Sequence, residues 1–114
     1  MDSISNVLIA KALDGLQARY EATAQNIANG NTPGYRPVRV AFEESLRAAA
    51  AQGPDAVAKV ASKMEFAPMP RIASEMRLDL EIATASQTAM RYGALLSVLD
   101  RQMAITRAAI AGGR

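Results

Sequence analysis

The feature that most constrains the fold is an apolar row in the C-terminal third of the chain, whose members recur at alternating spacings of four and three. This spacing places them on one face of an α-helix, in the heptad pattern of a coiled-coil seam. Asp79 and Glu81 at the start of the segment and Arg107 near its end complement the helix dipole. We therefore predict a helix over residues 77–110. The row consists of Leu78, Ile82, Ala85, Ala89, Tyr92, Leu96, Leu99, Met103, Thr106 and Ile110.

The N-terminal segment, which contains no proline, carries a similar row. It predicts a second helix over residues 3–29, opened by Asp2 or Ser3 as N-cap. We expect this helix to end at Asn29-Gly30, because these residue types accept the left-handed conformation that is common at helix C-termini. Two prolines then favour a loop over residues 30–37. The members of this row are Ile9, Leu13, Leu16, Tyr20, Thr23 and Ile27.

The middle of the chain, residues 38–76, has weaker signals. An alanine run favours helix in its first half, and Gly53-Pro54 interrupts that helix. Two further prolines disfavour helix later in the segment. We predict an extended stretch at 38–42, a short helix at 43–52, a marginal helical turn at 55–63 and an extended or irregular stretch at 64–70.

Composition excludes most site chemistries. The 114 residues suit one domain, residues 1–114, and they include no cysteine and no histidine. Disulfides, thiolate nucleophiles, imidazole bases and the usual zinc ligands are therefore absent. The close carboxylate pairs, Glu43-Glu44 and Asp79 with Glu81, occupy helical positions that do not converge on one site. We expect no enzymatic activity, no metal site and no cofactor.

The charge and hydropathy patterns point away from nucleic acid and membrane. The net charge is +2, with acidic and basic residues interspersed, and Arg36, Arg39 and Arg47 form only a small basic cluster. The apolar run near the start falls far short of the roughly 20 residues that a membrane helix needs. The first three residues also lack the positive charge that opens a cleaved signal peptide. We expect neither nucleic-acid binding nor membrane insertion.

The two long helices carry more apolar surface than a helical hairpin can bury. Each has a second row rotated away from the first, and a hairpin covers only one side of each helix. Each Leu or Ile left in water forfeits about 1.5 to 3 kcal/mol. Either the middle segment folds back and closes a small bundle, or other copies or other proteins cover the surplus. The second rows are Leu95, Val98, Ile105 and Ala109, and Ile4, Leu8 and Ala12, and the candidates for closure are Phe42, Leu46, Phe66 and Met69.

Two glycines lie inside the predicted helices. Gly15 and Gly93 each cost about 1 kcal/mol relative to alanine, and close approach of a neighbouring backbone is one reason to keep them. The expected fold class is accordingly all-α, with two long terminal helices that form an antiparallel, coiled-coil-like pair joined by a partly irregular middle segment.

The segment from Asn26 to Tyr35 is the most informative in the chain. Its sequence, Asn-Ile-Ala-Asn-Gly-Asn-Thr-Pro-Gly-Tyr, leads a helix C-terminus into a turn. Pro33-Gly34 suits the two central positions of a type II turn, and the proline pushes Thr32 into an extended conformation. The asparagine side chains can bond loose backbone groups. Taken alone, the segment reads as an elaborate helix stop.

This segment also resembles the N-terminal signature of the bacterial flagellar axial proteins, the rod, hook and hook-associated family. The resemblance implies that the terminal helices form an inner coiled-coil layer of a helical assembly, with the Asn-Thr-Pro-Gly-Tyr turn packed between subunits. Further residues are similar to the terminal helices of proximal rod subunits in that family: 12–19 and 25–29 upstream, and 78–82, Gln87, 91–92 and 94–96 downstream.

The resemblance implies a structural subunit of the proximal rod, which connects the MS ring and export base to the distal rod and transmits torque. It implies as partners other copies of the chain, other rod proteins, the adapter protein between MS ring and rod, and the MS ring or export gate. It also implies export without a cleaved signal peptide to the periplasmic rod of the basal body. The expected interface residues are Asn26, Asn29, Asn31, Thr32, Pro33, Gly34, Tyr35, Leu95, Leu96, Val98, Leu99, Met103 and Ile105.

A different class of function stays open. A helical hairpin can act as a regulatory or adaptor module whose second apolar row grips one partner helix. Such a module is folded alone and binds one partner stoichiometrically, whereas a rod subunit has frayed termini and polymerises or aggregates.

Overall fold

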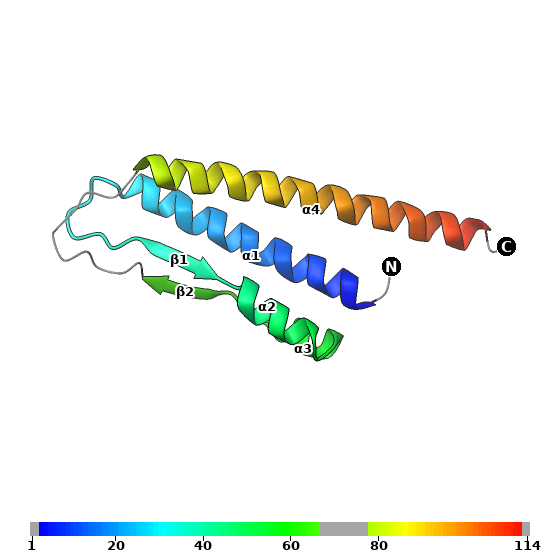
Figure 1. The fold of residues 1–114 in the computed structure, drawn as a ribbon. Coiled ribbons are helices and arrows are strands. Elements are labelled where there is room, and N and C mark those ends of the chain that lie inside the picture. Colours follow the sequence, from blue (N-terminus) through cyan, green and yellow to red (C-terminus); the bar gives the residue numbers. More distant parts are fainter. Residues whose placement is uncertain (1–2, 67–77, 113–114) are drawn as a thin grey trace.

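The computed structural model describes residues 3–66 and 78–112, and two long helices dominate its shape (Figure 1). Helix α1, Ser3–Ala28, and helix α4, Leu78–Gly112, lie side by side and run antiparallel. The molecule is elongated, with extents of 66 × 26 × 14 Å. The predicted antiparallel pair of long terminal helices is therefore confirmed.

The predicted helix bounds are close to those observed. The N-terminal helix ends at Ala28, one residue before its predicted end, and the C-terminal helix runs on to Gly112. The N-cap candidate Asp2 lies outside the described residues, as does Arg77 at the predicted start of the second helix. An unbroken apolar row without proline is thus a reliable guide to these two elements.

The middle segment forms a small sheet and two short helices. Strand β1, Val38–Ala41, pairs antiparallel with strand β2, Lys63–Phe66, and helices α2, Glu43–Ala50, and α3, Pro54–Ala58, lie between the strands in sequence. The register pairs Val38 with Phe66, Arg39 with Glu65, Val40 with Met64 and Ala41 with Lys63.

The elements of the middle segment were predicted better than their pairing. The extended stretch at 38–42 and the short helix at 43–52 are confirmed. The marginal turn begins earlier than predicted, because Pro54 occupies the first helical position, where its missing N–H costs nothing. The stretch at 64–70 is extended as far as Phe66, and the rest lies outside the described residues. The strand pairing was not predicted, and it adds a two-stranded sheet to a fold that is otherwise all-α.

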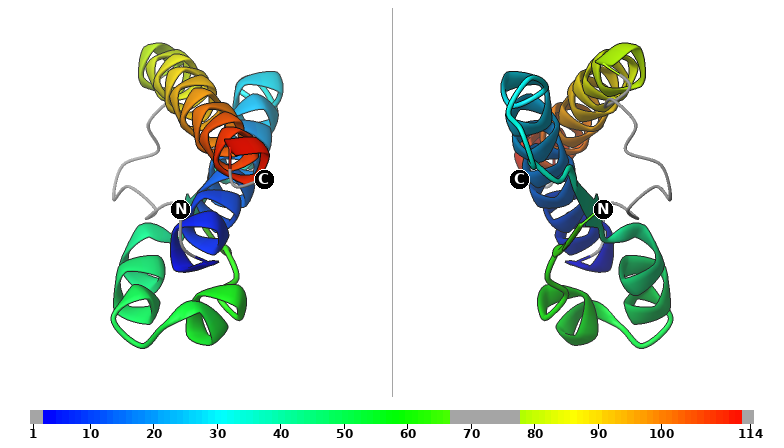
Figure 2. Two further views of the ribbon diagram at one scale, coloured as in Figure 1. Left: turned by 90° about the vertical axis from the view of Figure 1, so that its right-hand side faces the viewer. Right: turned by 90° about the vertical axis from the view of Figure 1, so that its left-hand side faces the viewer.

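Helix α1 is the centre of the molecule. It lies between α4 on one side and the strands with α2 and α3 on the other (Figures 1 and 2). Closure by the middle segment is therefore the correct alternative for α1, whose second row, Ile4, Leu8 and Ala12, packs beside the core. Of the closure candidates, Met69 and the side chain of Phe66 lie outside the described residues. The buried apolar core consists of Leu16, Ala22, Val40, Phe42, Leu46, Ala49 and Val57.

The ring of Phe42 explains the glycine inside α1. A Cβ atom added at Gly15 would lie 2.5 Å from atoms of this ring, which is too close for any real contact. The sequence predicted a close neighbour at this position, and the neighbour is an aromatic side chain rather than a backbone. At Gly93 in α4, by contrast, no atom of the described residues lies within 4 Å of an added Cβ.

Charged side chains fasten the middle segment to α1. The two terminal nitrogens of Arg19 donate to the two carboxylate oxygens of Glu43, each at 2.7 Å, and one of them also donates to the Val40 carbonyl oxygen at 2.8 Å. The guanidinium lies 4.8 Å from the centroid of the Phe42 ring. The hydrogen bonds from Arg19 lower the pKa of Glu43 to about 2. Nearer the start of α1, Lys11 Nζ donates to the carbonyl oxygen of Val60, which follows α3, at 3.0 Å.

Candidate assembly surfaces

The Pro33-Gly34 turn after α1 has the conformation that its sequence predicts, whereas the left-handed conformation expected at Asn29-Gly30 is not observed, because neither residue has a positive φ. The amide of Tyr35 donates to the Thr32 carbonyl oxygen at 3.1 Å, and Gly34 has a φ of 75°, as the third position of a type II turn requires. The Thr32 hydroxyl donates to Asn29 Oδ1 at 3.1 Å, and Asn29 Nδ2 donates to the Gln25 carbonyl oxygen at 2.9 Å. Asn31, Thr32, Pro33 and Gly34 are exposed at its tip.

Asn26 joins the turn, the sheet and α4. Its side chain is fully buried, and Oδ1 accepts from the Tyr35 hydroxyl at 2.8 Å and from the Val38 amide at 2.9 Å. Nδ2 donates to the Val38 carbonyl oxygen at 2.9 Å and to Glu81 Oε2 at 3.2 Å. Every hydrogen-bonding atom of this side chain is thus used within the chain. Asn26 and Tyr35, expected at an interface between subunits, hold their own subunit together.

Glu81 is the acidic partner in this cluster, and sequence reasoning missed it. Its side chain is buried, and Oε1 lies 2.7 Å from a terminal nitrogen of Arg39 on β1, which is half-exposed. From the sequence, Glu81 was assigned to the helix dipole and Arg39 to a small basic cluster. The available signal was the spacing: Glu81 begins a row that recurs every seven residues along α4.

The face of α4 that contacts α1 differs from the predicted one by one residue. We define the inner row as Glu81, Thr88, Leu95 and Gln102, which are buried or half-buried, and the outer row as Ile82, Ala89, Leu96, Met103 and Ile110, which are exposed. The prediction that the outer row packs against α1 is wrong, because the contacts of Glu81 with Asn26 and Arg39 turn the inner row inward. Both rows flank the same half-buried residues, Ala85, Tyr92 and Leu99.

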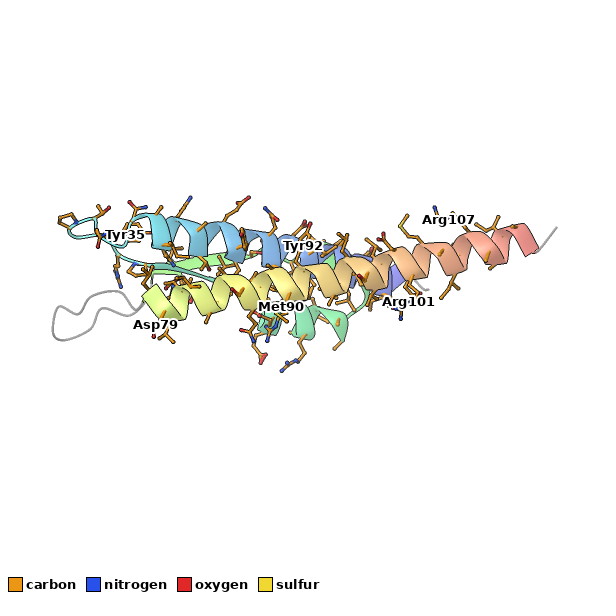
Figure 3. All side chains as sticks on the ribbon, turned by 90° about the horizontal axis from the view of Figure 1, so that it is seen from above. Tyr35, Asp79, Met90, Tyr92, Arg101 and Arg107 are labelled. Atoms are coloured by element: carbon orange, nitrogen blue, oxygen red, sulfur yellow. The ribbon has the colours of Figure 1, made fainter. Side chains whose placement is uncertain are left out.

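The apolar members of the outer row form an uncovered stripe along α4. Of the predicted interface residues on α4, Leu95 and Leu99 are half-buried, whereas Leu96, Val98, Met103 and Ile105 are exposed. Figure 3 shows Tyr92 at the line of contact with α1 and Met90 on the side of α4 that faces away from it. For α4, therefore, the part of the middle segment that the structure describes, residues 38–66, does not supply the cover. The exposed fractions are 51% for Ile82, 41% for Leu96, 52% for Met103 and 63% for Ile110.

The C-terminal end of α4 projects beyond α1 (Figures 1 and 3). Arg107 lies on this projecting end, and all of residues 103–112 are exposed. The projecting end therefore presents the apolar side chains of Met103, Ile105 and Ile110 to solvent.

Within residues 3–66 and 78–112, no helix is long and apolar enough to cross a membrane, and no group of three acidic side chains is placed to hold a metal ion.

Comparison with known proteins found a family whose model matches most of α1 and the turn that follows it. Residues 10–36 match the family described as the flagella basal body rod protein. This match supports the rod protein family. That family is one of structural proteins and not of enzymes. A search of curated proteins found no match.

The match to the rod family includes the turn after α1 but not the outer row of α4. It includes most of α1 and the whole turn from Asn26 to Tyr35, and so it contains Asn26 and Tyr35 but not their partners Val38 and Glu81. The apolar outer row of α4 lies outside residues 10–36.

Proposed function

We propose that the chain is a structural subunit of the flagellar rod, and specifically of the proximal rod, like the rod protein FlgB. The observation that carries this proposal is the exposed outer row of α4 in a chain whose α1 and turn match the rod family. An apolar stripe of this length is costly in water, and lateral packing of copies removes the cost. No catalytic group is needed for this role.

The shape of the molecule supports a load-bearing part. Two long helices, with α1 covered on two sides, make a stiff element, and stiffness with extensive lateral contact is what transmission of torque requires. As partners we propose other copies of the chain, other rod proteins, the adapter protein between MS ring and rod, and the MS ring or export gate. The proposed location is the periplasmic rod, after export without a cleaved signal peptide.

The proposed interface includes the outer row of α4 and the exposed tip of the turn, Asn31 to Gly34. Val98 and Ile105 are also exposed, but they lie on nearly the opposite side of α4 from Leu96 and Met103, because two residues turn a helix by about 200°. They therefore form a separate part of the proposed interface. Leu95 and Leu99 reach this interface only at its edge, because they are half-buried against α1.

Leu96→Asp tests the proposal most directly. Leu96 is exposed, so the substitution leaves the core intact and places a charge in the proposed interface. We expect the variant chain to fold, to be absent from isolated basal bodies, and to leave the host bacterium non-motile. Leu99→Asp is a poorer test, since Leu99 is half-buried and its substitution also disturbs packing within the chain.

Ser97→Asp is the matched control, because it makes the same kind of change at the next exposed position. We expect it to retain more motility than Leu96→Asp. Normal swimming and normal rod content in the Leu96→Asp strain, with the variant shown to be expressed, would count against a rod function.

One observation supports the alternative function, that of an adaptor module. The core around α1 is closed, with Val57 and Asn26 fully buried, so the chain has what a folded monomer needs. Sedimentation of the purified chain separates the two functions. A monomer that takes up one partner helix in a one-to-one complex supports the adaptor, and concentration-dependent growth into large assemblies supports the rod subunit.

A further inference from the structure

Helix α4 has two faces that could pack on α1, and the less apolar one does so. The inner and outer rows are adjacent in sequence and so lie about 100° apart around the helix. The inner row offers Glu81, Thr88 and Gln102 at three of its four positions, whereas the outer row is wholly apolar. Burial of apolar surface alone would place the outer row against α1. Some other interaction must select the inner row.

That interaction is the polar cluster at the start of α4. Glu81 Oε1 lies 2.7 Å from Arg39, and Glu81 Oε2 accepts from Asn26 Nδ2 at 3.2 Å. Asn26 is already held by Tyr35 and by both backbone groups of Val38, so its position does not depend on α4. A turn of α4 by one residue would take Glu81 away from both partners, which are preset on α1 and β1.

Open space flanks the contact between α1 and α4 at two places, one of them beside the polar cluster itself. A groove of about 510 Å³ lies between α1, β1 and the first turns of α4, and its lining includes Arg39, Thr84 and Gln87. A smaller cavity of about 170 Å³ lies among Leu16, Tyr20, Thr88, Ala89 and Tyr92. Interiors that are closely packed hold one arrangement, whereas such gaps leave side chains room to repack.

We infer that Asn26, Arg39 and Glu81 select which face of α4 packs on α1 and thereby keep the apolar outer row uncovered. Loss of the guanidinium at Arg39 leaves a buried carboxylate without its cation, and such a charge is strongly unfavourable. Rotation by one residue returns Glu81 to water and brings Ile82 and Ala89 against α1. Glu81 is then a positioning residue for the outer row. The consequence for assembly rests on the proposed function, but the choice of face does not.

Thiol labelling of adjacent residues measures the choice of face in the purified full-length chain. The chain contains no cysteine, so Thr88→Cys and Ala89→Cys each supply a single reporter. Thr88 is 3% exposed and Ala89 is exposed, so we expect maleimide to label the Ala89→Cys chain faster by about tenfold or more. In the Arg39→Ala background we expect the order of the two rates to reverse.

Two further variants keep the experiment interpretable. Adding Glu81→Leu to Arg39→Ala removes the buried charge together with the polar cluster, so burial of apolar surface alone decides the face and the reversed order of rates should persist. Arg47→Ala removes a cation whose side chain is 81% exposed and should leave both rates unchanged.

Three results would overturn the inference. The first is an unchanged order of rates with Arg39→Ala. The second is fast labelling at both positions in that background, which would mean that α4 detaches rather than rotates. The third is equal labelling of the two reporters in the unaltered background. None of these readouts depends on motility, so a swimming Leu96→Asp strain would remove the proposed rod function and leave the rotation result standing.

Discussion

Arg19 on α1 contacts three residues of the middle segment with one side chain. It binds both oxygens of Glu43, donates to the Val40 carbonyl oxygen and lies against the Phe42 ring. The sequence did not indicate this role, because an arginine on an exposed helical position is usually solvated. Gly34 is the opposite case. Its neighbours Thr32 and Pro33 determine the turn locally, and the positive φ was predictable from three adjacent residues.

The pair of Arg19 and Glu43 makes a prediction about pH. Because its folded-state pKa is lowered from 4.5 to about 2, the Glu43 carboxylate contributes stability above pH 4.5 and loses it as the pH falls through 2. We expect the unaltered chain to exceed Glu43→Gln in free energy of unfolding by less than about 1 kcal/mol at pH 7, since Glu43 is half-exposed. Denaturant titrations should show this difference shrinking between pH 4.5 and 2. Glu44→Gln, at an exposed position, is the control, and a difference that grows toward acid would contradict the assignment.

The elements themselves were largely predictable, but their faces were not. Both long helices and the short helix α2 follow from periodicity, alanine content and the positions of proline. The pairing of β1 with β2 was not predictable, because each strand has only four residues and two helices intervene. The inward face of α4 was predicted wrongly, since apolar spacing favours the outer row, whereas Asn26 decides the matter from 55 residues away.

The two glycines inside the helices make a paired prediction at this scale. Gly15→Ala places a methyl group into the Phe42 ring, so it should destabilise the chain by about 1 to 3 kcal/mol. Gly93→Ala meets no described atom, so it should stabilise the isolated chain by up to about 1 kcal/mol through helix propensity. Thermal unfolding of both variants checks the two signs. Stabilisation by Gly15→Ala would show that the ring does not occupy the place described.

Across the whole molecule, cover is distributed unequally between the two long helices. Helix α1 has neighbours on two sides, and α4 has α1 on one side and an exposed stripe on the other. The sequence led us to expect a surplus of apolar surface, covered either by the middle segment or by other molecules. The middle segment covers α1, whereas the apolar stripe of α4 stays exposed in the described structure. This division could not be read from the sequence, because it depends on which helix the middle segment folds over.

The projecting end of α4 makes a prediction about the molecule as a whole. A chain that stops after Gln102 loses only exposed residues of α4, so its free energy of unfolding should change by less than about 1 kcal/mol. We expect the same chain to be missing from isolated basal bodies. Met103→Asp in the 114-residue chain keeps the length of α4 and changes only its apolar surface. We expect this variant also to be missing from isolated basal bodies. Normal incorporation of the shortened chain would exclude this end from the interface.

The overhang of α4 also makes the two tips of the molecule unlike. Molecules whose two ends differ associate head to tail when the end of one overlaps the opposite end of the next. Such contacts give an open filament unless the rotation between neighbours closes a ring. Any fibre built this way has a direction, because one of its ends presents the projecting end of α4 and the other presents the turn after α1 beside the start of α4. The two ends of such a fibre therefore offer different surfaces to an added chain.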